Sequence, residues 1–386
     1  MRSKLLANTS IKSNYLIIIS HSARALSESA SRAGWNVISV DGFADTDTLE
    51  SCSECWCLPL NAGEFVRSQL ETCLTKLKQR YPQAKVILGA GVENLASNIE
   101  QFPSWQLCAN SSKTTSQLKD PHIFFEALRK LQVEYPSVQY GTTKPESGNW
   151  LYKLSDSCGG MGVSREYIDN PQGYWQQKIP GVAVSALCIS DGQDVFCLGV
   201  NQQYSISSFG AYPYVYLGAL ANAEISPVIK EKTATYTDKI INHFKLKGVF
   251  SVDMVLVDQR EQQGLYVLEV NPRISASFEL YERINPGLNL VDAHIRVCEG
   301  ERLSEIQLSN SQSAYLIVYA KNDCLISDQL VWPPWVKDKP EGLRQISQHE
   351  PICSVYADAG ETDDSLYLLL QRRADEVISL INQQFI

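Results

Sequence analysis

Residues Gly248 to Arg273 read GVFSVDMVLVDQREQQGLYVLEVNPR. This stretch contains two β-branched and aromatic runs on either side of a polar turn with Gln and Gly, which is typical of a β-hairpin. Asp253 and Glu269 can then lie side by side, and Asn271 points the same way two residues on. These oxygen ligands suit magnesium, which binds one or two carboxylates and leaves its other positions to water and phosphate. The hairpin therefore predicts a magnesium site formed by Asp253, Glu269 and Asn271.

The end of this stretch adds a fixed positive charge. Pro272 ends the second strand, and Arg273 then places a planar guanidinium close to where phosphate oxygens would lie. An ordinary hairpin with a surface Asp and Glu is the alternative. The magnesium site is favoured because apolar residues surround both carboxylates, and burying an unpaired charge is costly.

Length and composition indicate the class of protein. A chain of 386 residues predicts two to four subdomains, and 44% hydrophobic with 20% charged residues is typical of a folded globular protein. The net charge of -9 argues against nucleic acid or an anionic membrane as a partner, because both need an excess of Lys and Arg. The longest N-terminal apolar run, Tyr15 to Ile19, is too short for a membrane span. A cytoplasmic location is expected.

Eleven cysteines, an odd number, fit a reducing compartment better than a disulfide framework. Cys52, Cys55 and Cys57 look like the start of a zinc site, but no second ligand pair follows at zinc spacing. They are therefore interpreted as small buried residues. Cys158 lies inside a glycine loop without an obvious base beside it in the sequence, so it is not expected to be a nucleophile.

The first part of the chain predicts a βαβ unit. Buried strands are expected at Tyr15 to Ile19 and Trp35 to Asp41, with a helix between them and a functional edge at residues 20–24. A further parallel strand leads into Gly89-Ala-Gly-Val-Glu-Asn94, which begins like a dinucleotide-binding turn. The third glycine of that motif is missing, so an NAD-dependent dehydrogenase is disfavoured. A close-packed turn or a loop that faces the substrate explains these glycines as well.

The most glycine-rich turn of the chain is Ser157-Cys-Gly-Gly-Met-Gly-Val163, and it follows a strand that carries Lys153. Glycines let backbone N–H groups approach phosphate oxygens, and a mobile loop of this kind can close over a nucleotide. A flexible hairpin tip is the alternative. No GKS or GKT follows, so the turn is not a Walker loop. Two other segments read as irregular: Asn110 to Asp120 as a domain junction and Phe209 to Gly218 as a loop over the cleft.

The chain contains, in order, a βαβ domain, a lysine-bearing strand with a glycine loop, and a strand pair ending in LEVNPR. This order resembles that of the ATP-grasp enzymes, and the resemblance covers nearly the whole chain. Within them the chain is similar to predicted carboligases related to biotin carboxylase, some of which accompany one-carbon metabolism and its methanopterin and methanofuran cofactors. This closer resemblance is carried by Ser22-Ala-Arg-Ala-Leu26, Trp175 to Gly181, Val184-Ser-Ala-Leu187, Leu198-Gly-Val-Asn-Gln202 and Trp332-Pro-Pro-Trp335.

The resemblance implies an α/β (α+β) ATP-grasp fold in four parts. These would be a Rossmann-like pre-ATP-grasp domain at 1–110, a subdomain with the glycine-rich loop at 111–190, a subdomain with the metal site at 191–305 and a small α+β domain at 306–386. ATP and Mg²⁺, which Mn²⁺ could replace, would be the cofactors.

The resemblance also implies roles for single residues. Lys119 and Lys153 would contact the phosphates, Gly159, Gly160, Met161 and Gly162 would cover them, and Gln176, Gln177, Lys178 and Ile179 would hold the adenine. Many relatives place a Glu where this chain has Gln177-Lys178, which puts the nucleotide contacts there in doubt.

The implied reaction is that of an ADP-forming carboxylate–amine ligase in the biosynthesis of a one-carbon carrier cofactor. A substrate carboxylate attacks the γ-phosphate, and an amine captures the acyl phosphate, with Lys153 and Arg273 as catalytic residues. The alternatives are a bicarbonate-using enzyme like biotin carboxylase and a regulatory protein that binds ATP without turnover, which the altered hinge supports. A small acid and an amine would be the partners, and a homodimer is compatible with this class.

The substrate prediction rests on the carboxyl ends of parallel strands, where functional residues gather in open α/β sheets. This rule brings residues 20–24, 89–94 and 273–277 toward one cleft, which Arg24 and Arg273 make cationic. A small anionic carboxylate such as glutamate is therefore expected, held by Arg24 and Arg273 with Ser22 and Ser275 nearby. A surface or helix-capping role for Arg24 is the alternative.

Overall fold

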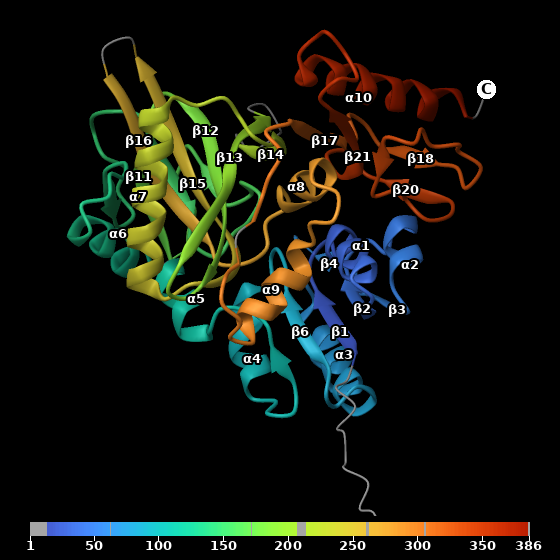
Figure 1. Cartoon of the computed structure of the whole chain (residues 1–386). Coiled ribbons are helices and arrows are strands. Elements are labelled where there is room, and N and C mark those ends of the chain that lie inside the picture. The colour runs from blue at the N-terminus through green and yellow to red at the C-terminus, as the bar shows by residue number, and fades with distance from the viewer. Residues whose placement is uncertain are drawn as a thin grey trace, which may run out of the picture.

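The computed structural model describes residues 14–61, 63–170, 172–206, 214–259, 262–304 and 306–384. Figure 1 shows the N-terminal part in blue beneath the two other large parts, with the strands that carry the acidic hairpin on one side and the C-terminal part on the other.

The N-terminal part is a parallel five-stranded sheet with the order β3-β2-β1-β6-β7. Residues 16–19 of β1 are fully buried, as expected for a parallel strand that is covered on both faces. The predicted Rossmann-like arrangement is confirmed. Its elements are β1 (Tyr15–Ile19), α1 (Arg24–Arg32), β2 (Asn36–Asp41), α2 (Thr46–Ser51), β3 (Glu54–Cys57), β4 (Leu60–Asn61), β5 (Glu64–Phe65), α3 (Arg67–Arg80), β6 (Lys85–Leu88), η1 (Glu93–Leu95), α4 (Ala96–Glu100) and β7 (Gln106–Leu107).

Two capped helices lead into the second part. The Ser111 side chain accepts a hydrogen bond from the Thr114 backbone N–H, so the polar segment that was expected to be a junction forms a helix. Asp120 caps the next helix in the same way. An antiparallel sheet with the order β10-β9-β11-β8 then carries the glycine-rich turn. The elements are α5 (Ser112–Lys119), α6 (Pro121–Lys130), β8 (Val138–Tyr140), β9 (Trp150–Leu154), β10 (Val163–Ser164) and β11 (Gly173–Gln177).

An eight-stranded sheet forms the largest layer, with the order β16-β15-β12-β13-β14-β17-β21-β19. The predicted hairpin is confirmed as β15 and β16, and α7 covers one face of the sheet (Figure 1). The predicted loop 209–218 is wrong at its end, because β14 begins at Val215, and residues 209–213 lie outside the described residues. The elements are β12 (Val182–Asp191), β13 (Val195–Ile206), β14 (Val215–Leu220), α7 (Pro227–Phe244), β15 (Lys247–Gln259), β16 (Gln262–Asn271), α8 (Phe278–Ile284) and α9 (Leu290–Cys298).

The C-terminal part continues this same sheet. Strand β17 pairs with β14, and β21 joins β17 to β19, while α10 packs on β17 and β21. The sheet therefore crosses the predicted boundary at residue 305, and the four domain limits stay a prediction. The remaining elements are β17 (Ser313–Tyr319), β18 (Cys324–Ile326), β19 (Val336–Lys337), β20 (Arg344–Ile346), β21 (Pro351–Asp358) and α10 (Leu366–Gln383).

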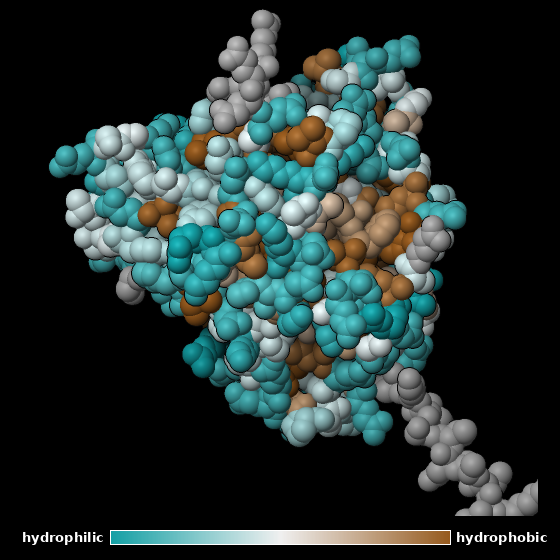
Figure 2. All heavy atoms as spheres, turned by 60° about the vertical axis from the view of Figure 1, so that its left-hand side comes forward, coloured by the Kyte–Doolittle hydropathy of each residue, from teal (hydrophilic) through white to brown (hydrophobic). Residues whose placement is uncertain are grey.

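The outer surface agrees with the polar composition. On the face in Figure 2 hydrophilic side chains predominate, and hydrophobic residues gather in separate areas. Across the described ranges, the model has no helix with the length and apolar character of a membrane span.

Candidate active site

The register of β15 and β16 brings the predicted metal ligands together. Asp253 lies opposite Glu269 and Ser251 opposite Asn271, with a bulge directly after Asp253. The Asn271 side-chain amide donates to Asp253 Oδ2 over 3.0 Å, and Gln203 on β13 donates to Asp253 Oδ1 over 3.2 Å. Asp253, Glu269 and Asn271 thus form one cluster at the end of the hairpin.

The two carboxyl groups of this cluster have opposite protonation preferences. Burial, and then repulsion from Glu269, raise the pKa of Asp253 to about 7. Burial would also raise the pKa of Glu269, but Lys153, Lys119 and Arg273 outweigh it and lower that pKa. At neutral pH Asp253 is therefore partly protonated, whereas Glu269 is ionised.

Cations from three different elements surround this carboxylate pair. Lys153 on β9 places Nζ 3.8 Å from Glu269 Oε2 and 3.4 Å from Gln176 Oε1. Lys119 ends α5 and acts on both Glu269 and Glu93. Arg273 directly follows β16, and only about 11% of its side chain is exposed. The structure therefore brings the predicted phosphate-binding and metal-binding residues to one place.

The glycine-rich turn is fitted closely against the start of β14. Gly159 accepts a hydrogen bond from the Tyr216 backbone N–H over 3.0 Å. A Cβ atom on Gly160 would lie 1.8 Å from the Tyr214 carbonyl oxygen, and its φ of +79° also favours glycine. A Cβ atom on Gly162 would also be too close to its neighbours, since it would lie 1.9 Å from Ser157 Oγ. Met161, between these two glycines, is exposed. Cover of phosphates by this turn stays a prediction.

The segment expected to hold adenine is the end of β11 and the link to β12. The backbone N–H groups of Gln177 and Lys178 already donate to Ser137 and Asn149 carbonyls, so they are not free for a ligand. Gln176 is buried, and its Nε2 atom has no hydrogen-bond partner among the described residues. A ligand acceptor could satisfy this donor. The adenine role of Gln176 to Ile179 stays a prediction.

The donor set fits magnesium bound together with phosphates. Two carboxylates and one amide oxygen are too few for a metal cage made by protein alone, but they suit an ion that shares phosphate and water ligands. Within the described ranges no three His, Cys, Asp or Glu side chains are arranged as a metal site. Asp253, Glu269 and Asn271 would therefore hold Mg²⁺ through its nucleotide.

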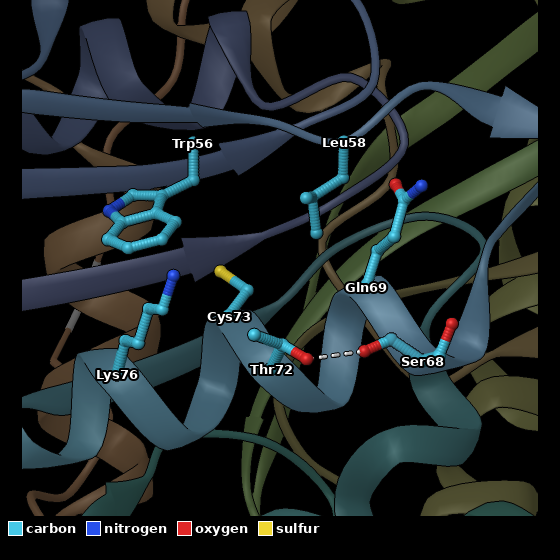
Figure 3. Close-up of a pocket in the computed structure, with 7 residues that line it drawn as sticks. All are labelled: Trp56, Leu58, Ser68, Gln69, Thr72, Cys73 and Lys76. Atoms are coloured by element: carbon cyan, nitrogen blue, oxygen red, sulfur yellow. Dashed lines mark hydrogen bonds between the residues drawn. The ribbon is translucent and has the colours of Figure 1, made fainter.

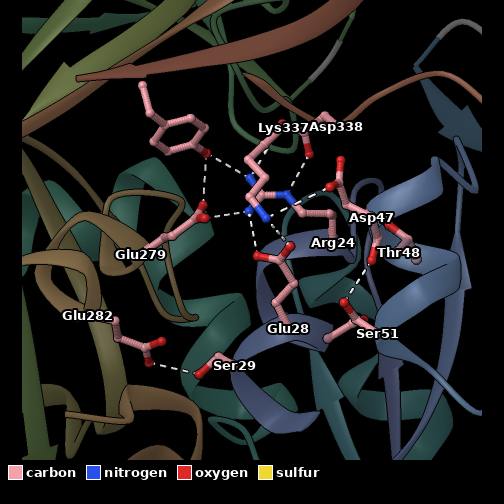
Figure 4. A network of polar contacts seen from close by, with 12 residues as sticks. Arg24, Glu28, Ser29, Asp47, Thr48, Ser51, Glu279, Glu282, Lys337 and Asp338 are labelled. Atoms are coloured by element: carbon pink, nitrogen blue, oxygen red, sulfur yellow. Dashed lines mark hydrogen bonds and ion pairs between the residues drawn. The ribbon is translucent and has the colours of Figure 1, made fainter. Parts of the chain in front are cut away.

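Contact of Arg24 with the substrate stays a prediction, and in this structure its donors already have protein partners. Its guanidinium is buried and pairs with Glu279 at 2.5 Å and Asp338 at 2.8 Å, and it also donates to the Tyr356 hydroxyl at 2.7 Å (Figure 4). Glu28 lies 3.3 Å away on the same helix. Arg24 thus joins α1 to α8 and to the C-terminal part, and its burial contradicts the surface role that was one alternative.

The two predicted serine contacts differ in position. Ser22 is exposed at the end of the first strand. Ser275 lies beside the metal hairpin, where its hydroxyl is 2.6 Å from that of Ser251. Ser275 is therefore placed within the cluster, and substrate contacts for both residues stay predictions.

Sequence reasoning missed three residues of the site. Glu93, in the turn that was weighed as a dinucleotide motif, accepts from Arg273 Nε over 2.7 Å. Gln203 holds Asp253, and His21 lies beside the glycine turn. For Glu93 the available signal was its place in the segment 89–94, which was considered as a loop that faces the substrate. For His21 the signal was its place in the segment 20–24, at the carboxyl end of the first strand.

A separate shallow pocket of about 390 Å³ lies on the N-terminal part, between β3 and α3 (Figure 3). Trp56 and Leu58 face the helix, and Lys76 lies 5.9 Å from the Trp56 ring centre. Its lining is completed by Ser68, Gln69, Thr72 and Cys73, and none of these belongs to the acidic hairpin or the glycine turn.

Comparison with known proteins finds a matching domain model and distant relatives for this part of the chain. Residues 119–277 match the ATP-grasp domain model. The arginine-specific large chain of carbamoyl phosphate synthase from Halalkalibacterium halodurans is 25% identical over 233 residues, which cover 53% of this chain and 21% of that protein. The large chain from Clostridium botulinum is 27% identical over 212 residues, covering 49% and 19%. The chain spans about a fifth of the length of these relatives.

Solved structures resemble the chain over more of its length. The biotin carboxylase domain of the 2-oxoglutarate carboxylase from Hydrogenobacter thermophilus, a dimer in complex with MgADP, ADP and bicarbonate, has a TM-score of 0.73 at 14% identity, covering 95% of this chain and 89% of that one. An L-amino acid ligase from Bacillus licheniformis has a TM-score of 0.68 at 15% identity, covering 94% and 97%. At these identities the likeness shows the fold. The chain therefore has the ATP-grasp α/β fold, and the clustered hairpin, lysines and arginine lie within residues 119–277, the part that matches the ATP-grasp domain model.

Proposed function

We propose that the chain is an ADP-forming ligase that joins a small carboxylic acid to an amine through an acyl phosphate. The observation that carries this proposal is the carboxylate pair of Asp253 and Glu269 enclosed by Lys119, Lys153 and Arg273 beside a glycine turn. Phosphoryl transfer depends on positioning and electrostatic stabilisation, so it needs no side-chain nucleophile.

The residues divide this work among them. Bound Mg²⁺ would supply neutralising charge to the phosphate oxygens. Glu269 is ionised at neutral pH, whereas Asp253 gives up its proton when it becomes a ligand. Gln203 and Asn271 fix the Asp253 carboxyl group by hydrogen bonds, which sets its direction. Lys119 and Lys153 add positive charge beside Glu269.

Arg273 is suited to hold the phosphate of the acyl phosphate. Glu93 fixes its Nε over 2.7 Å, while its two terminal nitrogens make only long contacts of 3.4 Å, to the Ile274 carbonyl and to Asn271 Oδ1. The planar end of the side chain is thus oriented but still able to donate to a ligand.

An amine acceptor is supported by the likeness to the L-amino acid ligase, which extends over 94% of this chain and 97% of that one. A second candidate is a bicarbonate-using carboxylase, which the likeness to the 2-oxoglutarate carboxylase domain favours. Release of ADP with bicarbonate in the absence of an amine would identify this second reaction. The one-carbon pathway, the homodimer and the regulatory alternative stay predictions.

The test is a screen for activated acids. The protein is incubated with ATP, Mg²⁺ and single acids, namely L-glutamate, the other proteinogenic amino acids and short dicarboxylates, with hydroxylamine as a general trap. Mass spectrometry should find one acid converted to its hydroxamate in equal amount with ADP. A wild-type protein that forms no hydroxamate from the panel, yet releases ADP with bicarbonate, would contradict the ligase proposal.

A matched pair of variants tests the metal cluster in the same assay. Glu269→Gln removes one ligand charge at nearly constant volume, and we expect it to lower hydroxamate formation by about 100-fold or more, since even the outer partners of metal ligands matter by 10–100-fold. Glu231→Gln, on the exposed side of α7, should keep wild-type activity. Equal activity of the two variants would show that Glu269 does not hold the metal.

A further inference from the structure

His21 lies directly after β1, at the carboxyl edge of the parallel sheet, and the surrounding residues fix its ring. Its backbone N–H donates to the Ala90 carbonyl over 3.0 Å, and the Phe65 ring meets the imidazole edge-on at 5.4 Å between centres. Gly91 lies under the ring, where any Cβ atom would come within 2.0 Å of His21 Cε1. A larger residue at position 91 would therefore displace the imidazole, and this explains the second glycine of the incomplete dinucleotide motif.

The two ring nitrogens face the region between the N-terminal part and the glycine turn. Nδ1 lies 4.0 Å from the Cys158 sulfur of that turn. Nε2 is buried and has no hydrogen-bond partner among the described residues, since the Glu64 carboxylate is 3.7 Å away. A buried polar atom without a partner is costly, and a bound ligand could satisfy it. His21 is also part of the site, because Glu93 and Arg273 both act on its charge.

Burial favours a neutral imidazole ring, and the acidic groups around it favour a cationic ligand. Burial lowers the pKa of His21, Arg273 lowers it further, and Glu93 opposes this shift. The imidazole is therefore a free base at neutral pH. Burial raises the pKa of Glu64, and repulsion from Glu93 and from Asp156, the residue before the glycine turn, adds to this. Arg273 neutralises Glu93, so Glu64 and Asp156 leave a surplus of negative charge that an ammonium group would relieve.

We propose that His21 is the general base that takes the proton from the ammonium group of the second substrate, which binds between Glu64, His21 and the glycine turn. This inference rests on the proposed ligase function. The ammonium transfers one proton to His21 Nε2 and becomes a neutral amine. Its lone pair forms the C–N bond at the acyl carbon and the C–O bond to phosphate breaks. One of the two protons left on the nitrogen leaves with the phosphate near Arg273, and the other stays on the amide. The acid thus binds on the cationic side of the site and the amine on the acidic side.

The test compares two small nucleophiles in one enzyme. Hydroxylamine is largely neutral at pH 7 and needs no base, whereas methylamine is largely protonated and must lose a proton first. His21→Asn should lower methylamide formation by at least about 100-fold, the usual size of general base catalysis, while hydroxamate formation stays within about threefold of wild type. His243→Asn, the same change at an exposed position on α7, should alter neither product. In the wild type, methylamide formation should fall as the pH drops below 6.5 through the lowered pKa of His21.

The outcomes separate the two proposals. If the wild type forms no hydroxamate from any acid of the panel, the ligase function itself fails. If it forms hydroxamate but no methylamide, or if His21→Asn lowers both products equally, the general-base role of His21 is overturned and the residue acts only in folding. Unchanged methylamide formation in His21→Asn overturns it as well.

Discussion

The metal-free protein should lose stability between pH 6 and pH 8, and Asp253 should account for part of the loss. Its pKa is raised from 3.8 to about 7 in the folded protein by burial and by Glu269. A carboxyl group with a raised folded pKa stabilises the fold while it is protonated, and this contribution is lost as the pH rises through 7. Over this interval the folding equilibrium constant changes about tenfold, which is about 1.4 kcal/mol. Water screens the repulsion, because the Glu269 side chain is 42% exposed, so this is an upper limit.

Urea unfolding in EDTA at the two pH values measures this effect. Asp253→Asn should remove up to about 1.4 kcal/mol of the pH-dependent loss. The comparison with the variant is needed because Asp45, whose pKa burial and Asp338 also raise to about 7, gives a loss of the same sign. Asp375→Asn, an exposed change on α10, should keep the wild-type pH dependence.

Magnesium should reverse the trend in the wild type. Metal ligands must be deprotonated, so Mg²⁺ with ADP should stabilise the protein more at pH 8 than at pH 6. If Asp253→Asn shows the same pH dependence as the wild type in EDTA, the idea that this carboxyl group keeps a proton at neutral pH is refuted.

Two further changes test other parts of the structure. Lys153→Met should weaken ATP binding by about 10–100-fold, measured by calorimetry, because it removes a charged hydrogen-bond donor from the phosphate site, whereas Lys130→Met on the exposed face of α6 should leave binding unchanged. Arg24→Met should lower the free energy of unfolding by about 3–5 kcal/mol, because Glu279 and Asp338 lose their buried partner. If the variant instead has a higher KM for the acid and keeps its stability, this structural role is contradicted.

The parts of the site that could be predicted from sequence are local ones. Asp253, Glu269 and Asn271 lie on two strands joined by a short turn, so the alternation of side chains was enough to bring them together. Lys153 and the glycine turn follow each other in the chain in the same way. The alternation of polar and apolar residues within these short segments is enough to predict which side chains lie together.

Contacts between distant segments could not be predicted. The partners of Arg24, Glu279 and Asp338, lie 255 and 314 residues away, and no local pattern shows such a pairing. His21 and Cys158, 137 residues apart, meet for the same reason. The helix at 112–119 was missed because its polar composition hid a Ser111 cap that only helical geometry reveals.

The continuous eight-stranded sheet determines which part of the molecule can move as a separate subdomain. The hairpin with Asp253 and the C-terminal strands belong to one hydrogen-bonded sheet, and Arg24 of the N-terminal part pairs with Glu279 on α8 and with Asp338 directly after β19. The N-terminal part, the hairpin and the C-terminal part therefore form one rigid unit. They cannot move relative to one another without breaking backbone hydrogen bonds between strands or a buried ion pair. The four-stranded sheet with the glycine turn is connected to these parts by the short links 131–137 and 178–181, and its turn also contacts β14 through the hydrogen bond between Tyr216 and Gly159. We therefore expect the site to open and close by a rigid-body rotation of the four-stranded sheet alone. The hinges would be these two links, the second of which adjoins the segment expected to hold the adenine.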